Sequence, residues 1–452
     1  MKLIICGAGV IGSNLGRYLP EEGHEVNLIE QDEKAARRAS EKLDVRVLVG
    51  SASNPSILEL AGIAESDMVV AVTDSDLANL AICSLAAAYG TRHRIARVRS
   101  MGLNDVIHRF GQDHFHVDEI INPDEVAAQA IAKVLAAPGS REVADFADDK
   151  VLLRSFHVPE GSPLTEIRLE DLKGHDFPWP FLVVAINRNG LVIIPRGEDT
   201  IQVGDRIYVM LPKPSLPEFL TFVHPEVRLP RKVIVYGATN TGVSLSMSLV
   251  DRVPEVLLLE EDRKLAEKVA GTLSKVRVIS GSASEADILH ECGIEAADAF
   301  VAVSGSDTSN LVSAVLAKKM GAKTTVITTN QPEYVGIVGA LDIDAVINPR
   351  LLATDQILRL VRGGRISTLA TLPECKAEVL ELIPETDSPV TRKPIRDLRL
   401  PKNCIIGAVH RGAEVLLASG ETHIRPGEQV VVFCHEDAVT SMERFFSRKK
   451  LF

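Results

Sequence analysis

Short runs of β-branched and other apolar residues alternate along the chain with longer stretches of mixed polarity. In the first half the apolar runs are "KLIIC" (2–6), "EVNLI" (25–29), "VRVLV" (45–49), "DMVVAV" (67–72) and "HRIARV" (93–98). Their length and β-branched content predict buried strands, and the stretches between them predict helices. This alternation indicates an α/β domain built on a parallel, doubly wound sheet.

The end of each half has a different texture. Shorter strand-like runs, such as "FLVVAINRNG" (181–190), "LVIIP" (191–195) and "DRIYVM" (205–210), are broken by Gly, Asn and Pro turns. They predict a small α+β module. The segment 211–230 contains five prolines and is typical of a connection, although "EFLTF" within it is compatible with a short helix.

The chain repeats itself. The segment "KLIICGAGVIGSNL" (2–15) matches "KVIVYGATNTGVSL" (232–245), "VRVLVGSAS" (45–53) matches "VRVISGSAS" (276–284), and "VAVTDSDLANL" (70–80) matches "VAVSGSDTSNL" (301–311). Further pairs, "EIINPDE" (119–125) with "AVINPRL" (345–351) among them, extend the repeat over nearly the whole chain. We therefore expect four domains in tandem: sheet domains at 1–136 and 229–362, a module with linker at 137–228, and a second module at 363–452.

Composition excludes several classes of protein. Hydrophobic residues make up 46% and charged residues 25% of the 452, which favours packed cores over disorder. The net charge of −11 argues against attraction of the whole chain to nucleic acid or anionic lipid. The start of the chain shows no secretory signal and no apolar run is long enough to span a bilayer. The six cysteines form no CxxC pair, so we expect neither a zinc site nor a disulfide framework, and a cytoplasmic protein with reduced thiols.

A glycine-rich turn follows the first apolar run. In "GAGVIG", Gly7, Gly9 and Gly12 take the three glycine places of a dinucleotide-binding turn: the tight turn, the approach of backbone to pyrophosphate, and close helix–strand packing. Glu30 ends the next strand-like run, where a carboxylate can bind ribose hydroxyls. No basic residue follows Glu30 until Lys34, which favours NAD or an adenosine nucleotide over NADP. The alternative is an empty α/β turn.

The second half keeps this pattern in part. Its turn, "GATNTG", retains Gly237 and Gly242 but has Thr239 at the place of the approach glycine, and Glu260 keeps the spacing of Glu30. We expect nucleoside binding with altered phosphate geometry, or an empty, structural site. A chain with two vestigial sites would be a scaffold, and the equal spacing of the two glutamates argues weakly against that interpretation.

Polar residues follow the fourth and fifth strands of each half. The segments "TDSD" (73–76) and "SGSD" (304–307) lie where a doubly wound sheet places ligand contacts, although Asp76 and Asp307 could equally cap the following helices. Arg97 and Arg99 of "RIARVRS" are replaced in the second half by threonine and asparagine. Since guanidinium groups suit phosphates, the first site is expected to take the more highly charged nucleotide.

An oxidoreductase is the alternative in another functional class, but a proton-transfer residue for it is hard to find. The cluster "DHFHVDE" (113–119), with His114 and His116, has no counterpart in the second half and fits a polar loop better than a metal or acid–base site. Two nucleotide-binding domains without evident catalytic residues favour a protein that senses nucleotides over an enzyme.

Taken together, the full duplication, "GAGVIG" with Glu30, "VAVTDSD", "RIARVRS" and the closing segment 400–433 resemble the tandem KTN (RCK) regulatory subunits of bacterial Trk potassium uptake systems. The resemblance implies Rossmann-like RCK N domains, each followed by an RCK C module. It further implies binding of NAD(H) and ATP or ADP, a homo-oligomeric ring (dimer or tetramer), and docking on a membrane-embedded potassium-translocating subunit of the TrkH or TrkG type at the cytoplasmic face of the membrane.

By position, the resemblance also implies which residues contact nucleotide. The first site has Gly7, Ala8, Gly9, Val10, Ile11, Gly12, Glu30, Ser51, Thr73, Asp74, Arg97 and Arg99. The second has Gly237, Ala238, Thr239, Asn240, Thr241, Gly242, Glu260, Ser282, Ser304 and Gly305. Where many members of the family have an aspartate after the third strand, both halves here read "GSAS", with Ser51 and Ser282 at that place. We expect nucleotides with different phosphate charge to favour different angles between neighbouring sheet domains. The docked membrane subunit is expected to respond to this change of angle.

Overall fold

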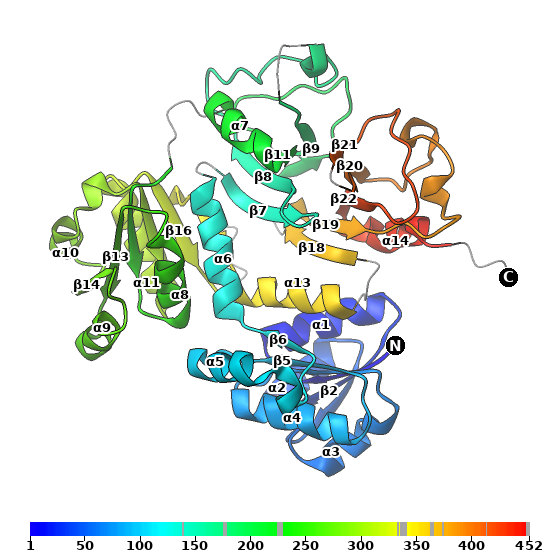
Figure 1. The fold of residues 1–452 in the computed structure, drawn as a ribbon, viewed down its shortest axis with the longest axis vertical. Coiled ribbons are helices and arrows are strands. Elements are labelled where there is room, and N and C mark those ends of the chain that lie inside the picture. Colours follow the sequence, from blue (N-terminus) through cyan, green and yellow to red (C-terminus); the bar gives the residue numbers. More distant parts are fainter. Residues whose placement is uncertain are drawn as a thin grey trace. The chain divides into compact units, whose positions relative to one another are not determined.

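The computed structural model describes residues 1–137, 140–174, 179–223, 229–331, 334, 341–361, 366–372, 375–412 and 414–448. It contains two six-stranded parallel sheets and two five-stranded antiparallel sheets, which alternate along the chain (Figure 1). The prediction of tandem, doubly wound sheet domains, each followed by a small module, is confirmed. The predicted domain ends at 228 and 362 lie outside the described residues.

The first parallel sheet has the strand order β3-β2-β1-β4-β5-β6. Its strands are β1 (Lys2–Cys6), β2 (Glu25–Glu30), β3 (Arg46–Val49), β4 (Met68–Ala71), β5 (His93–Arg97) and β6 (Glu119–Ile121). The helices of this half are α1 (Val10–Glu21), α2 (Glu33–Lys42), α3 (Pro55–Leu60), α4 (Asp76–Ala88), α5 (Met101–Phe110) and α6 (Pro123–Ala136). The order reverses between β1 and β4, and such a switch point leaves a crevice at the carboxyl ends of the strands.

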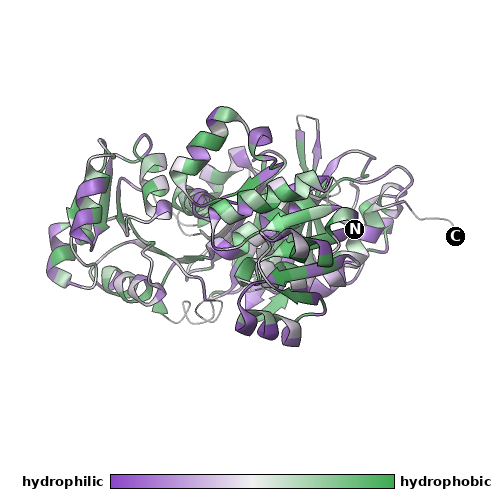
Figure 2. Cartoon of the chain, turned by 90° about the horizontal axis from the view of Figure 1, so that it is seen from below, coloured by the Kyte–Doolittle hydropathy of each residue, from purple (hydrophilic) through white to green (hydrophobic). Residues whose placement is uncertain are grey.

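The second parallel sheet repeats this order as β14-β13-β12-β15-β16-β17. Its strands are β12 (Lys232–Tyr236), β13 (Glu255–Glu260), β14 (Arg277–Ser280), β15 (Ala299–Ala302), β16 (Thr324–Thr328) and β17 (Ala345–Ile347). The helices of this half are α8 (Asn240–Leu249), α9 (Arg263–Ala270), α10 (Ala286–Glu291), α11 (Asp307–Lys319) and α13 (Pro349–Val361). The central strands of both sheets are buried on both faces, as their apolar sequences predict. Figure 2 shows the strands as largely hydrophobic, with hydrophilic positions gathered on the helices.

Each small module is an antiparallel sheet with a terminal helix. The first has β7 (Ser140–Phe146), β8 (Val151–His157), β9 (Leu182–Arg188), β10 (Leu191–Ile193), β11 (Arg206–Pro212) and α7 (Leu216–Val223). The second has β18 (Ile366–Leu372), β19 (Ala377–Leu382), β20 (Cys404–Arg411), β21 (Glu414–Leu417), β22 (Gln429–His435) and α14 (Val439–Phe446). The "EFLTF" stretch lies inside α7, and its Phe219 is fully buried, so this part of the proline-rich segment belongs to a core.

The two modules share one apolar core. Phe146, Tyr208 and Met210 of the first pack in the same buried cluster as Val431 and Phe433 of the second. None of the helices in the described ranges combines the length and the apolar run needed to cross a bilayer.

The chain divides into two compact units that do not follow the sequence repeat. One comprises Met1–Ala127 together with Pro349–Val361, and the other comprises Ala128–Asn348 together with Arg362–Phe452. Helix α13, which follows the last strand of the second sheet, therefore belongs to the unit of the first sheet. There it packs against α1 and beside β6 (Figure 1), and its buried positions include Ala353, Ile357 and Leu358.

Candidate nucleotide-binding sites

Two glycines of the first turn are required by the fold itself. Gly7 has φ +109°, a region that favours glycine, and a Cβ there would lie 3.0 Å from the carbonyl oxygen of Val72. A Cβ on Gly12 would lie only 1.9 Å from the carbonyl oxygen of Gly7. These glycines let the turn close tightly and α1 pack onto β1, as two of the three glycines of the motif do.

Gly9 is different, because the fold does not need a glycine there. Its φ of −66° suits any residue, and an added Cβ would meet nothing within 4 Å. Gly9 is the N-cap of α1, and no side chain caps the helix. The first amide groups of α1 thus have no side-chain cap, and uncapped amides at the positive end of a helix dipole are the groups that bind phosphate at helix N-termini.

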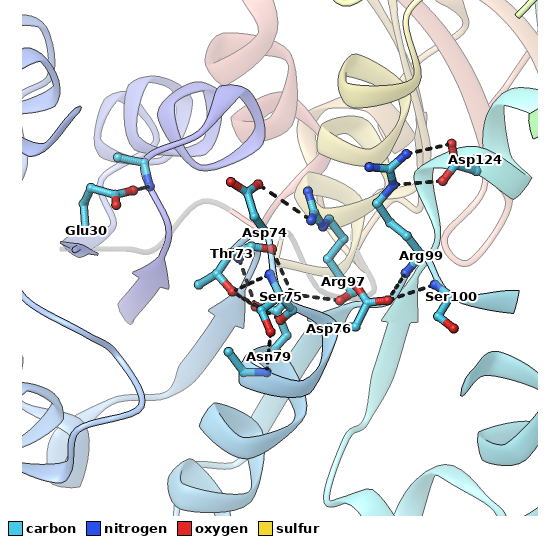
Figure 3. A network of polar contacts seen from close by, with 12 residues as sticks. Glu30, Thr73, Asp74, Ser75, Asp76, Asn79, Arg97, Arg99, Ser100 and Asp124 are labelled. Atoms are coloured by element: carbon cyan, nitrogen blue, oxygen red, sulfur yellow. Dashed lines mark hydrogen bonds and ion pairs between the residues drawn. The ribbon is translucent and has the colours of Figure 1, made fainter. Parts of the chain in front are cut away.

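Glu30 lies directly across this turn (Figure 3). One carboxylate oxygen accepts a hydrogen bond from the backbone N–H of Ala8 at 2.7 Å, and the other accepts from that of Asp32 at 2.9 Å. Glu260 makes the same pair of contacts, with Ala238 at 2.5 Å and Asp262 at 2.9 Å. Each carboxylate keeps further lone pairs, so both glutamates are fixed at the edge of the turn with acceptor capacity left for ribose hydroxyls.

A buried asparagine joins the ends of the fourth and fifth strands in each sheet. Asn79 accepts from the backbone N–H of Thr73 at 2.9 Å and from its hydroxyl at 2.6 Å, and donates to the carbonyl oxygens of Thr73 and Arg97. Asn310 makes the corresponding contacts to Ser304 and Thr328. Both asparagines are fully buried. Neither asparagine is among the predicted site residues, although the same Asn stands six residues after the hydroxyl residue in both repeats.

The suggestion that Asp76 and Asp307 cap the helices is wrong. Ser75 and Ser306 are the N-caps, through side-chain bonds to the amides of Ala78 and Ser309. Asp76 instead accepts from the backbone amides of Arg99 and Ser100, at 3.0 and 2.8 Å, and Asp307 accepts from that of Asn330. These carboxylates therefore hold the segment after the fifth strand beside the crevice.

The two arginines of the first site differ in their partners (Figure 3). Arg99 forms a forked ion pair with Asp124, with Nε at 2.9 Å from one oxygen, and this hydrogen bond raises the pKa of Arg99. The Arg97 side chain is 12% exposed, and within the described ranges its ion-pair contact is a long one, 3.9 Å from Nη2 to exposed Asp74. Its buried Nε has no hydrogen-bond partner. Burial first, and then the Arg99 guanidinium, lower the pKa of Arg97. An arginine remains protonated regardless, so Arg97 is a cation with no close acceptor among the residues that the structure describes.

The second site differs from the first in the residues that would contact the phosphates of a nucleotide. Thr239 is the N-cap of α8: its hydroxyl accepts from the N–H of Gly242 at 3.2 Å and donates to the carbonyl oxygen of Val303 at 2.8 Å. One amide that is open in the first turn is therefore already bonded here. Gly305 replaces Asp74, and Thr328 replaces Arg97. The replacement of Arg97 removes a cation that suits phosphate, whereas the replacement of Asp74 removes an anion.

Replacing Thr239 with glycine is expected to strengthen nucleotide binding at the second site by about tenfold, which is about 1.4 kcal/mol. The change removes a Cβ and frees the Gly242 amide, while glycine at an N-cap costs only a few tenths of a kcal/mol. Calorimetric titration with ATP and NADH, with the first site disabled by Glu30→Ala, measures the gain. Thr239→Ala is the control, because it frees the amide but keeps the Cβ. An unchanged or lower affinity of Thr239→Gly would show that the hydroxyl does not limit this site.

The remaining predicted contacts surround the two turns. Val10 and Ile11 open α1, and Asn240 and Thr241 open α8. On the adenine side, Ser51 is exposed and accepts from the amide of Ser53 at 3.3 Å. Ser282 lies 2.9 Å from the Ser284 hydroxyl and near Tyr236, whose pKa is raised mainly by burial. Tyr236 replaces Cys6 of the first repeat, so the adenine sides of the two sites differ as well.

The histidine pair lies away from these turns. His114 belongs to a short 3-10 turn (Gln112–Phe115), and both His114 and His116 are exposed. Within the described ranges, no group of three or more His, Cys, Asp or Glu side chains is arranged to hold a metal ion.

The repeated unit matches two known domain families. The TrkA-N domain matches residues 3–123 and 233–349, and the TrkA-C domain matches residues 153–224 and 379–447. Among solved structures, the RCK domain of GsuK aligns with a TM-score of 0.61 at 15% identity, over 98% of this chain and 94% of that one. The fold and the paired turns define a tandem RCK protein. Its chain contains two copies of an RCK N sheet domain, and each copy is followed by an RCK C module.

Full-length relatives identify the family. The chain is 32% identical to the Trk system potassium uptake protein TrkA of Azorhizobium caulinodans, over 99% of this chain and 98% of that protein. It is also 32% identical to TrkA of Vibrio alginolyticus, over the full length of both. The chain belongs to the TrkA family of potassium uptake proteins. Members of this family are non-enzymatic regulatory subunits of potassium transport, so the oxidoreductase alternative is wrong.

Proposed function

We propose that the chain binds NAD(H) and ATP or ADP in its two sheet domains and, through them, gates a membrane-embedded potassium-translocating subunit. The observation that carries this proposal is the pair of equivalent crevices, each with a glycine turn, a glutamate across it and an asparagine-linked strand pair, that differ at the phosphate end. Solved GsuK channel structures described as bound to NAD and to ADP have the same fold, with TM-scores of 0.61 and 0.50.

The residues that would contact phosphate suggest which nucleotide each site prefers. The first has an uncapped α1, Arg97 and Arg99, and the second has a capped α8 and no arginine at either place. We assign the nucleotide with more phosphate charge to the first site. The predicted contact residues and the predicted limits of the four domains are part of this proposal.

Gating requires that nucleotides favour different shapes of the assembly. A nucleotide shifts such an equilibrium only by its difference in affinity for the two shapes. A tenfold bias needs about 1.4 kcal/mol, within the range of one charge-assisted contact to a phosphate. In this proposal the chains form a homo-oligomeric ring docked on the TrkH or TrkG type subunit at the cytoplasmic face, and the docked subunit reads the ring's shape.

Calorimetric titration of the purified protein with NADH, NAD, ATP and ADP tests the binding step. Saturable binding is expected, with one class of site lost in Glu30→Ala and the other in Glu260→Ala. Potassium flux through the reconstituted membrane subunit, compared with ATP and with ADP present, then tests gating. Absence of binding by all four nucleotides would refute the proposal, and binding without any effect on flux would refute its gating step.

Arg97→Ala is expected to reduce the preference of the first site for ATP over ADP by about tenfold, because it removes the cation available to a terminal phosphate. Competition of ATP and ADP for the first site measures this preference. The control is Arg92→Ala, which removes an exposed charge at the amino end of β5, away from the crevice. An equal loss of affinity for ATP and ADP would contradict the role given to Arg97.

A further inference from the structure

Two cysteines of the second small module lie directly opposite each other on neighbouring strands. Cys404 begins β20, Cys434 is the last residue but one of β22, and the register of this antiparallel pair places them side by side. The backbone N–H of His435 donates to the carbonyl oxygen of Asn403 at 3.0 Å. Since hydrogen-bonded and non-hydrogen-bonded pairs alternate along such strands, Cys404 and Cys434 form a non-hydrogen-bonded pair, in which side chains approach most closely.

The spacing of such a pair suits a disulfide bond. The Cα atoms of a non-hydrogen-bonded pair lie about 4.5 Å apart, and disulfides join residues whose Cα atoms are about 4.4 to 6.8 Å apart. Both cysteines are free thiols in this structure. A bond between Cys404 and Cys434 can therefore form without a large movement of either strand.

The fold does not require cysteine at either position. In the first module the repeat has Phe181 and Leu211 at the same two places, and these side chains pack in one apolar cluster. Large apolar residues therefore suffice for packing there. One free cysteine can serve as a small apolar residue, but two that face each other can also form a covalent bond, which the pair in the first module cannot.

The two thiols differ in exposure and in acidity. Cys404 is partly exposed, whereas Cys434 is fully buried. A hydrogen bond from Cys434 lowers the pKa of Cys404, and the same bond, followed by burial, raises the pKa of Cys434. Glu378, opposite Cys434 on β19, and Glu443 of α14 raise it further. Cys404 is thus the thiol that reaches solvent and ionises first, as an attacking thiol must.

The other cysteines are placed differently. All six lie in the described ranges, and Cys404 is the one that is not buried. Cys375 packs with Phe433 in the core shared by the two modules. Because successive side chains of a strand point to opposite faces, Cys375 and Cys434 lie on opposite faces of the sheet. Burial raises the pKa of the remaining three thiols, those of Cys6, Cys83 and Cys292, which makes them unreactive.

We propose that Cys404 and Cys434 form a reversible thiol–disulfide site that is oxidised by a low-molecular-weight disulfide. The Cys404 thiolate attacks one sulfur of that disulfide, breaks its S–S bond, forms a mixed disulfide and releases one thiolate. Cys434 then loses its proton, attacks the Cys404 sulfur and displaces the second thiolate. Two protein thiols become one disulfide, and the oxidant becomes two small thiols that take up the two protons. Excess small thiol reverses the exchange.

This site gives the second module a covalent state that depends on the balance of small thiols and disulfides around it. In a reducing compartment such disulfides are usually transient and redox-sensing, so the pair of thiols is the resting state. The inference does not depend on nucleotide binding, because both cysteines belong to the small module and not to a sheet domain.

The test treats the folded, full-length protein with glutathione disulfide, blocks the remaining thiols with an alkylating reagent and identifies linked peptides by mass spectrometry without reduction. Loss of two alkylatable thiols is expected, with Cys404 joined to Cys434, and excess reduced glutathione should restore both. Cys434→Ala is expected to stop at a mixed disulfide of Cys404 with glutathione. Cys404→Ala should leave Cys434 reduced, because the oxidant does not reach a buried thiol. Cys375→Ala is the matched control and should form the link as the parent does.

The parent protein alone can overturn the inference, so the decision does not require that any variant folds. No link in the folded parent, or a link that forms only in urea, overturns it. Oxidation of the parent that stops at a mixed disulfide on Cys404 also overturns it, because Cys434 would then be out of reach. A link from Cys404 to Cys375, or to Cys404 of a second copy, does the same. A reversible link between Cys404 and Cys434 in both the parent and Cys375→Ala supports the inference.

Discussion

Replacing Gly12 with alanine is expected to destabilise the first sheet domain by about 3 kcal/mol, the upper end of the usual cost of overpacking. The new methyl group would lie 1.9 Å from the carbonyl oxygen of Gly7. That oxygen belongs to the backbone of the turn and cannot rotate away, so α1 must lift from β1. The apolar residues of α1, Leu15 and Leu19 among them, are fully buried and would lose contacts.

Scanning calorimetry measures this effect as a drop of the lowest unfolding transition, on the order of 10 °C for a domain of this size. Gly102→Ala is the control within the same domain. Gly102 lies in the first turn of α5 with open space around it, so alanine there should leave the transition unchanged or raise it slightly. A Gly12→Ala protein that melts within about 2 °C of the parent would show that the turn is looser than described.

Replacing Gly9 with threonine is expected to leave stability intact and to weaken nucleotide binding at the first site about 100-fold, which is about 2.7 kcal/mol. This change copies the second turn into the first. Val72 occupies the place of Val303, so the new hydroxyl can donate to its carbonyl oxygen and cap α1, as Thr239 caps α8. Its Cβ and methyl group would occupy the space through which phosphate approaches the amides of α1.

Titration with ATP and NADH in the Glu260→Ala background measures the loss, and a melting curve on the same sample checks the fold. Gly9→Ala separates the two parts of the effect, because it adds the Cβ without the hydroxyl. Loss of binding together with a lower melting temperature would mean that Gly9 serves the fold. Full binding by Gly9→Thr would mean that phosphate does not approach α1 at this residue.

Much of the architecture could be predicted from the sequence, because the signals are local. Five of the six strands of the first sheet coincide with apolar runs, and the glycine turns follow from spacing. The sixth strand, β6, is only three residues long and gives little periodicity to detect. The turn residues predict a small α+β module at the end of each half. They do not predict the strand order, because it depends on pairings between distant segments.

Other features could not be predicted, because they depend on contacts across the fold. Asp124 meets Arg99 across 25 residues of chain, and Asp76 reaches amides beyond the fifth strand rather than its own helix. The presence of Thr239 at the place of the approach glycine predicts altered phosphate geometry, but not that its hydroxyl caps α8. The place of α13 could not be predicted, because the sequence repeat suggests that each helix packs on the sheet of its own half.

That placement of α13 limits how the duplicated protein can evolve. A chain that lost its second copy would also lose the helix that covers α1 on the first sheet, and would expose apolar residues that the helix now buries. The two copies can therefore diverge in sequence, as Gly9 and Thr239 have done, but the second cannot be lost without removing this helix from the first. Because the second copy supplies this helix, the packing of the first sheet domain depends on the presence of both copies.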